Sequence, residues 1–223
     1  MRNTTEIGLD RWQSLDQEAW RLIVAKLKGR SARPDVRRPR PHQRAAISAA
    51  KKHFIGDGAT RGRLIMPCGT GKSLTAYWIA EALKAKTILV AVPSLALVRQ
   101  SLADWTREFL AHSVVPDWLC VCSDETAGNL ERDEFVGEVY DLGLPTHTDT
   151  NEIAGLLRAR SNGPRIVFTT YQSSDKLAAA ARKAHTEFDL AILDEVLSRF
   201  VLELGDAISG ISRVPSQAAR SIG

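Results

Sequence analysis

Residues 66–73 read MPCGTGKS and stand between an apolar stretch and a helical pattern, so they predict a strand, a glycine-rich turn and a helix. Glycines in such a turn let backbone N–H groups approach the β- and γ-phosphates of a nucleotide, and the dipole of the following helix adds to the attraction. Lys72 supplies a cation, and the Ser73 hydroxyl is a ligand for Mg²⁺. An ordinary glycine-rich turn is the alternative, and GTGKS after an apolar strand argues against it. The stretch therefore predicts a phosphate-binding loop.

The loop departs from the general pattern at one position. That pattern has a glycine five residues before Gly71, where this chain has Met66. The departure argues against a small-molecule kinase. The candidate nucleotide-binding residues of the loop are Pro67, Cys68, Gly69, Thr70, Gly71, Lys72 and Ser73.

Apolar runs and helical patterns alternate along the chain after residue 42. Short runs such as ILVAV at 88–92 and LAIL at 190–193 are apolar on both faces, which is typical of a parallel sheet covered on both sides. We therefore expect an α/β fold with a mostly parallel sheet, and a loop or insertion at 123–150. The expected strands are 63–66, 87–92, 118–122, 166–169 and 190–193, and the expected helices are 43–54, 72–84, 95–111, 151–160 and 172–185.

Two carboxylates follow the last expected strand. Asp194 and Glu195 come directly after LAIL, in the position where a phosphate-binding loop needs an acidic partner. We expect Asp194 to hold Mg²⁺, usually through a water, and Glu195 to polarise the attacking water. An acidic pair after a strand is by itself more often a helix cap or a solvated turn. Downstream of GTGKS the catalytic interpretation is the better one.

The amino-terminal region predicts an amphipathic helix and a basic linker. Apolar residues recur at helical spacing within 5–28, and residues 29–40 contain two prolines and five arginines. Eight basic residues against the single Asp35 lie between Lys26 and Arg44, so the positive charge of the chain is concentrated there. These basic residues could contact nucleic acid or form a solvated linker, and the sequence leaves both interpretations open.

Composition indicates an ordinary globular protein. The chain has 223 residues, 44% hydrophobic and 25% charged, with a formal net charge of +4, which suits one α/β domain with an appendage. Its three cysteines show no metal-binding spacing and indicate a reducing compartment. No signal peptide or membrane-spanning stretch is predicted. We expect a cytoplasmic protein without a membrane partner.

Five motifs in order resemble a known family. They are PHQR at 41–44, the phosphate-binding loop, PSLALVRQ at 93–100, TTYQS at 169–173 and LDE at 193–195. The set resembles the first RecA-like domain of superfamily-two helicases of the DEAD/DEAH type, as found in restriction and phage-defence systems. The resemblance covers residues 40–195 and implies a RecA-like three-layer sandwich. It also implies ATP and Mg²⁺ as cofactors, and Lys72, Asp194 and Glu195 as catalytic residues.

The resemblance assigns further binding roles. Gln43 would bind the edge of adenine, and Ser94, Arg99, Thr169 and Thr170 would contact a nucleic-acid backbone, DNA in preference to RNA. Simpler interpretations stay open: Gln43 and Ser94 as helix caps, and the two threonines as residues that favour strands. The implied partner is a second RecA-like domain or a separate downstream polypeptide.

The resemblance ends after Glu195. The family has Ala-His or Ala-Asp there, and this chain has Val196 and Leu197. We therefore expect three segments: a helix and basic linker at 1–39, the ATP-binding domain at 40–195 and a divergent, truncated tail at 196–223. The expected function is ATP hydrolysis coupled to nucleic-acid binding, slow without the arginine finger of a second domain. A P-loop kinase or other NTPase and a non-catalytic binding fragment are the alternatives.

Overall fold

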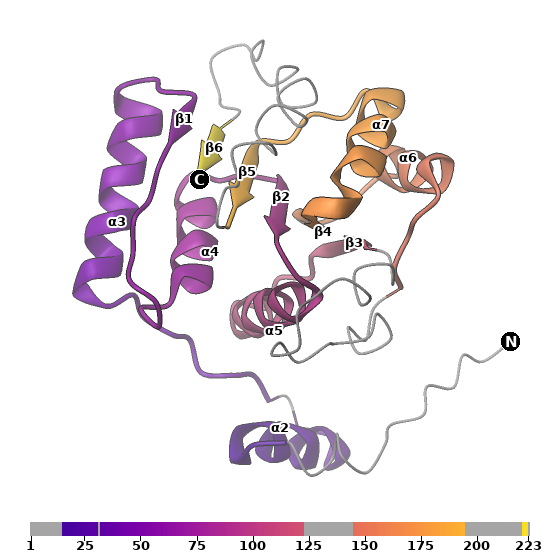
Figure 1. Ribbon diagram of the computed structural model, residues 1–223. Helices are drawn as coiled ribbons and strands as arrows, with labels where there is room; N and C mark the ends of the chain where they lie inside the picture. Colours follow the sequence, from indigo (N-terminus) through magenta and orange to yellow (C-terminus); the bar gives the residue numbers. More distant parts are fainter. Residues whose placement is uncertain (1–14, 31, 123–144, 195–219, 223) are drawn as a thin grey trace, which may run out of the picture.

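The computed structural model describes residues 15–30, 32–122, 145–194 and 220–222, and it contains a six-stranded parallel sheet with helices on both faces (Figure 1). The strand order is β1-β6-β5-β2-β4-β3. This arrangement confirms the predicted α/β class with its parallel sheet. The strands are β1 (Arg61–Gly62), β2 (Thr87–Val92), β3 (Asp117–Val121), β4 (Arg165–Thr170), β5 (Leu190–Leu193) and β6 (Arg220–Ile222).

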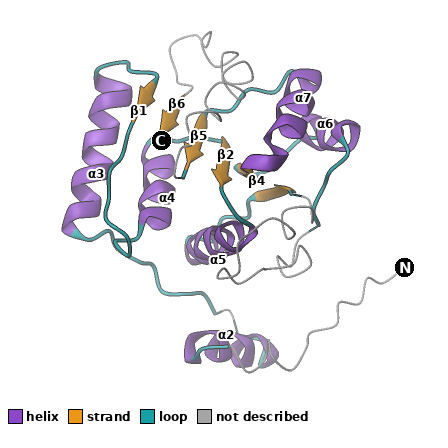
Figure 2. Cartoon of the chain, viewed as in Figure 1, coloured by secondary structure: helices purple, strands orange, loops and turns teal. Residues whose placement is uncertain are grey.

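Two apolar layers enclose the sheet because side chains alternate along each strand. Ile88, Val90 and Val92 of β2 face α4 and α5, whereas Leu89 and Ala91 face α6 and α7. The three layers of a RecA-like sandwich result, with α3 beside α4 (Figure 2). The helices are α2 (Gln17–Leu27), α3 (Pro41–Lys51), α4 (Lys72–Ala82), α5 (Leu95–Ala111), α6 (Thr150–Arg158) and α7 (Ser174–Ala184), with a π turn η1 (Lys52–Gly56) and a 3₁₀ turn η4 (Tyr171–Ser173).

Strand register brings the carboxyl ends of the central strands to one edge. Ile88 of β2 pairs with Ile166 of β4 and with Leu190 of β5. The Asp189 carboxylate accepts hydrogen bonds from the backbone N–H groups of Lys86 and Thr87 at 2.8 and 2.9 Å, which ties the start of β5 to the start of β2. The segments that follow β2, β4 and β5 therefore emerge side by side, where ligands bind in open parallel sheets.

The strand before the phosphate-binding loop differs from the expected one. We expected 63–66, and the structure has β1 at Arg61–Gly62, after which residues 63–71 continue without a strand to α4. The physical reason is the partner: β1 pairs with the three-residue β6, whose Ser221 and Ile222 lie opposite Arg61 and Gly62. Residues 63–66 have no strand beside them among the described residues.

The expected boundary at 195 leaves out part of the sheet. Arg220–Ile222 form β6 between β5 and β1, so the end of the expected tail belongs to the sheet of the domain. A strand of three residues without an apolar run is too short to be predicted from the periodicity of the sequence. The other residues of the expected tail, 196–219, lie outside the described part of the chain, as do 123–144 of the expected insertion.

Local signals explain where several helices begin. Asp16 caps α2 by accepting from the backbone N–H of Ala19 at 2.7 Å, and Pro41 occupies the first turn of α3, where no N–H is needed. The expected helix 5–28 is described as α2 from Gln17, because residues 5–14 lie outside the described part. None of the described helices combines the length and apolar character needed to cross a bilayer.

Candidate nucleotide site

The phosphate-binding loop is a closed turn held by its own side chains. Gly69 and Gly71 have φ of 73° and 81°, in the left-handed region that favours glycine. The Thr70 hydroxyl donates to the carbonyl of Pro67 at 2.6 Å, and the Thr75 hydroxyl donates to the carbonyl of Gly71 at 2.9 Å. Helix α4 begins directly afterwards at Lys72, so its first N–H groups and its positive dipole end lie at the turn. This geometry suits an anion.

Two groups of the loop have no partner among the residues that the structure describes. The Ser73 Oγ is buried and makes no hydrogen bond with any described residue. The Lys72 ammonium, at the first position of α4, forms no ion pair in the described part of the chain. Buried polar atoms in folded proteins are almost always bonded, so an unbonded one needs an explanation such as a bound ion. The two groups together fit a metal-bound phosphate.

Gln43 lies against the loop rather than in an open pocket. Its side chain is buried, and Oε1 accepts from the backbone N–H of Arg40 at 2.8 Å, which caps α3. Its Nε2 donates to the carbonyls of Thr70 and Gly71 at 3.2 and 3.4 Å. Gln43 is therefore a helix cap and a tether of the loop. Its contact with adenine stays a prediction.

A side chain at position 71 would also displace the Gln43 amide from this tether. A Cβ on Gly71 would lie 2.7 Å from the Gln43 Nε2, closer than real Cβ atoms approach such a group. His42 lies on the loop as well, with its Nε2 3.2 Å from the carbonyl of Thr70. The start of α3 and the phosphate-binding loop therefore form one packed unit.

The acidic side of the site begins where β5 ends. The backbone N–H of Asp194 donates to the carbonyl of Ala91 at 3.0 Å, which continues the β2–β5 ladder by one residue. The Asp194 side chain is half-buried and has no ion-pair partner among the described residues. Glu195 lies outside the described residues. Asp194 and the loop both follow parallel strands and so belong to the same edge of the sheet, with β6 between their strands.

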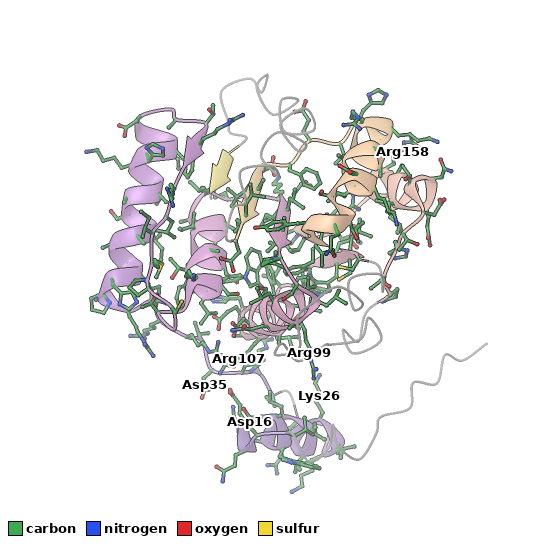
Figure 3. The ribbon with its side chains drawn as sticks, viewed as in Figure 1. Asp16, Lys26, Asp35, Arg99, Arg107 and Arg158 are labelled. Atoms are coloured by element: carbon green, nitrogen blue, oxygen red, sulfur yellow. The ribbon has the colours of Figure 1, made fainter. Side chains whose placement is uncertain are left out.

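The residues expected to contact nucleic acid fall into two groups. Ser94 is a helix cap, accepting from the backbone N–H of Leu97 at 3.4 Å, and Arg99 lies exposed one turn further along α5 (Figure 3). Thr169 and Thr170 are fully buried. Their hydroxyls donate inward, to the carbonyl of Val121 at 2.9 Å and to the Ser173 hydroxyl at 3.4 Å.

The two threonine side chains are thus enclosed within the domain, and their contact with nucleic acid stays a prediction. The reason is that β4 lies between β2 and β3 with helices over both faces, so even its last residues are enclosed. The Thr169 hydroxyl instead ties β4 to β3, and the Thr170 hydroxyl bonds Ser173 in η4. Of the four residues expected to contact nucleic acid, Ser94 and Arg99 on α5 are the two that are not buried.

The basic linker is held by acidic residues of α5. Arg37 forms ion pairs with Asp104 at 3.1 Å and with Glu108 at 3.7 Å. Arg107 binds both carboxylate oxygens of Glu18 at 2.7 and 2.9 Å, and so joins α2 to α5 (Figure 3). Burial raises the pKa of the Glu108 carboxyl, and the charges of Arg37 and Arg107 oppose that shift.

Sequence reasoning did not identify this ion-pair network. One signal was available: Glu108 falls on the apolar stripe of α5, three residues after Trp105 and one before Phe109. A carboxylate at such a position has to be paired when the helix is buried. In the structure Arg37 of the linker and Arg107 of α5 are the arginines that pair with Glu108, at 3.7 and 3.4 Å.

A separate cavity lies at the opposite edge of the sheet. It has a volume of about 500 Å³, and Lys86 and Pro164, which precede β2 and β4, line it together with Tyr77, Trp105 and Phe109. Because these residues stand at the amino ends of the strands, the cavity is not part of the nucleotide site.

Comparison with known proteins gives a family and several relatives. Residues 37–196 match the model of a family described as Type III restriction enzyme, res subunit. Over 163 residues the chain is 28% identical to the TFIIH basal transcription factor complex helicase/translocase XPB subunit of Trypanosoma brucei brucei (strain 927/4 GUTat10.1), covering 71% of this chain and 14% of that protein.

Two solved structures are similar in fold. One is a nuclease-deletion mutant of the Type ISP restriction-modification enzyme LlaGI in complex with a DNA substrate mimic, with a TM-score of 0.58 and 26% identity over 83% of this chain and 17% of that one. The other is the ATP-dependent Type ISP restriction-modification enzyme LlaBIII bound to DNA, with a TM-score of 0.61 and 24% identity over 84% and 13%. The chain thus spans less than a fifth of each relative. Since the family model matches most of its length, the chain belongs to the Type III restriction enzyme res subunit family.

Proposed function

We propose that this chain is the ATP-binding domain of a nucleic-acid-dependent ATPase of the helicase type. The observation that carries the proposal is that two groups in the loop, the buried Ser73 Oγ and the Lys72 ammonium, have no partner among the described residues. A structural turn would satisfy these groups internally, as the fold does for Thr70 and Thr75. A loop built for Mg²⁺ and phosphate leaves them for the ligand.

Each residue at this edge has a distinct proposed role. The backbone N–H groups at Gly69 to Gly71 and the Lys72 ammonium bind the phosphates, while Ser73 and Asp194 hold Mg²⁺. When bound, the metal neutralises charge on the phosphate oxygens. Glu195, one residue beyond Asp194, orients the attacking water. Gln43 keeps the loop in its binding shape through Thr70 and Gly71.

Nucleic acid is the proposed partner at the amino end of α5. Ser94 and the exposed Arg99 present a hydroxyl and a cation there, the groups that commonly contact phosphate backbones. We propose DNA rather than RNA because one of the two similar solved structures is a complex with a DNA substrate mimic and the other is bound to DNA. A second RecA-like domain, in the same or another polypeptide, is proposed to complete the catalytic cleft, since the relatives are much longer than this chain.

Nucleotide titration tests the proposal directly. We would titrate a fluorescent ATP analogue with Mg²⁺ or with EDTA, in the absence and presence of single-stranded DNA, duplex DNA and RNA, and measure phosphate release in parallel. We expect Mg²⁺-dependent binding that DNA strengthens more than RNA does, with slow release of phosphate. Transfer of phosphate to a small acceptor would identify a kinase and overturn the proposal, as would binding that is indifferent to Mg²⁺.

The linker arginines separate a DNA contact from a structural ion pair. Arg38 and Arg40 are exposed, whereas Arg37 is paired with Asp104 and Glu108. We expect the double variant R38A/R40A to bind DNA more weakly and with a smaller salt dependence, because each phosphate contact contributes to counterion release. R37A is the matched control, with nearly unchanged DNA affinity and lower stability. Equal DNA affinity in all three proteins would restrict the linker to a solvated role.

A further inference from the structure

Trp105 is an α5 residue that reaches the phosphate-binding loop from the core. Its side chain is 1% exposed, and its ring lies 5.5 Å from Tyr77 of α4 and 6.1 Å from Phe168 of β4 in edge-to-face contacts. Phe109, one turn further along α5, packs beside it at 6.5 Å. The indole is therefore packed against two other elements, α4 and β4, and against Phe109 of its own helix.

The indole makes one hydrogen bond, and it goes to the loop. Its Nε1 donates to the backbone carbonyl of Ser73 at 3.1 Å. Ser73 is the second residue of α4, and its carbonyl has a second lone pair free for such a donor. The residue that Trp105 holds by its backbone is thus the one whose hydroxyl is buried and unpartnered among the described residues.

Another tryptophan in the same cluster lacks this contact. Trp118 of β3 packs against Phe168 at 5.9 Å and Phe109 at 5.7 Å, so its ring has neighbours like those of Trp105. It makes no hydrogen bond to the loop. Packing alone does not require an indole N–H to point at Ser73, and a phenylalanine at position 105 would fill most of the same space.

We infer that Trp105 is a positioning residue for the Mg²⁺·ATP site. It fixes the first turn of α4 so that the Ser73 Oγ faces the metal. This inference rests on the proposed function of the loop. α5 also carries Ser94 and Arg99 toward its amino end, about 16 and 9 Å from Trp105 along the helix, so one rigid element joins the proposed nucleic-acid surface to the proposed metal ligand. No residue of the recognised helicase motifs makes this connection in the described part of the chain.

The first experiment compares W105F with W118F. Both variants lose an indole from the same aromatic cluster, but only W105F loses the bond to Ser73. We would measure the affinity for a fluorescent ATP analogue with saturating Mg²⁺ and with EDTA. We expect W105F to lose about tenfold of the Mg²⁺-dependent affinity, the usual effect of removing a group that orients a metal ligand, with its affinity in EDTA unchanged. W118F should match the parent in both conditions.

A double-mutant cycle shows whether Trp105 acts through Ser73. S73A removes the hydroxyl and should abolish most of the Mg²⁺-dependent gain in affinity. If Trp105 acts by aiming that hydroxyl, W105F should have no further effect in the S73A background. Independent, additive losses would overturn the inference, because they would mean that Trp105 acts on the domain as a whole.

The nucleic-acid connection has its own measurement. In the parent, DNA is expected to raise the affinity for Mg²⁺·ATP, and W105F should reduce this gain while R99A should weaken DNA binding itself. Thermal unfolding of W105F and W118F checks that both fold. If W105F does not, benzothienylalanine at position 105 keeps the shape of the ring and removes only the N–H.

The outcomes distinguish the two proposals. A parent chain that binds no nucleotide overturns both. A parent that binds Mg²⁺·ATP normally while W105F behaves like W118F, or while the benzothienyl variant behaves like the parent, overturns the role of Trp105 alone.

Discussion

The phosphate-binding loop and the basic linker both carry positive charge, yet the fold treats them in opposite ways. The side-chain hydroxyl of Ser73 and the ammonium of Lys72 have no polar partner among the described residues. Arg37 of the linker is bound to Asp104 and Glu108, and Arg107 of α5 binds Glu18 of α2. Positively charged side chains therefore stabilise the fold in the linker, whereas in the loop we propose that they bind a ligand.

The difference shows how to separate a binding cation from a structural one. A charged group that is paired within the protein contributes to the free energy of unfolding, so removing the group lowers stability. A group left without a partner contributes to binding, and removing it costs affinity. The predictions below test this contrast, beginning with the largest expected effect.

Lys72→Ala should nearly abolish nucleotide binding and leave the fold intact. The ammonium has no ion pair in the described part of the chain, so its loss affects only the phosphates. We expect a fall in ATP affinity of about 100-fold or more, as for the loss of a charged group that binds phosphate. Fluorescence titration and thermal unfolding measure the two properties.

Lys86→Ala is the matched control, because Lys86 lies at the opposite edge of the sheet, beside the separate cavity. It should bind ATP like the parent. Unchanged ATP binding by Lys72→Ala would show that the site assignment is wrong.

Arg107→Ala should reduce stability without changing ATP affinity. The variant leaves Glu18 without its bidentate partner and the fully buried Glu108 with only Arg37 nearby. We expect the free energy of unfolding to fall by about 2 kcal/mol, measured by urea denaturation. Arg21→Ala removes only exposed ion pairs at 3.8 and 3.9 Å and should change stability by less than about 0.5 kcal/mol. Similar losses in both variants would contradict the assignment of Arg107 as the main anchor.

Cys68 offers a chemical test of the loop. Its thiol is exposed, whereas Cys120 and Cys122 are buried and burial raises the pKa of each to about 12. A maleimide should therefore modify Cys68 selectively, since the thiolate is the reactive form and needs access. We expect Mg²⁺·ATP to slow this reaction about tenfold in the parent, as a bound ligand excludes the reagent, and to have no effect in Lys72→Ala. Equal rates with and without nucleotide in the parent would argue against binding at the loop.

The ion-pair network should give opposite pH effects at its two carboxylates. Burial raises the pKa of Glu108, so its contribution to stability is lost as pH rises. The hydrogen bond from Arg107 lowers the pKa of Glu18, so its contribution is lost as pH falls. Between about pH 4 and 7, Glu108→Gln should gain stability relative to the parent as pH rises, and Glu18→Gln should lose it. Thermal unfolding across this range measures both trends, and parallel trends would contradict the assignment.

The sequence predicted the sheet and the loop because their signals are local. The apolar runs at 87–92 and 190–193 became β2 and β5, and the helical spacing at 95–111 became α5 with the expected bounds. The short β6 could not be predicted, since three residues become a strand only through the partners on either side. For the same reason the strand before the loop was placed two residues too late.

For the site residues, the sequence indicated which side chains carry suitable functional groups, but it did not indicate which of those side chains are exposed. Thr169 and Thr170 have hydroxyls suited to phosphate, but their burial follows from the position of β4 inside the sheet. The amide of Gln43 was expected to bind adenine. Because α3 packs against the loop, this amide donates hydrogen bonds to the carbonyls of Thr70 and Gly71 in the structure. No pattern in the sequence relates Trp105 to Ser73, which lie 32 residues apart.

The sequence by itself determined the α/β class, the glycine-rich turn, and the order of motifs that led to the family. These depend on residue type and spacing over a few positions. Only the tertiary structure decided which polar groups are satisfied within the protein and which are left for a ligand. That distinction depends on contacts between distant segments: α5 with the linker, α3 with the loop, and Trp105 with Ser73. Only these contacts show which positive charges are paired within the protein: Arg37 is, whereas Lys72 forms no ion pair with the described residues.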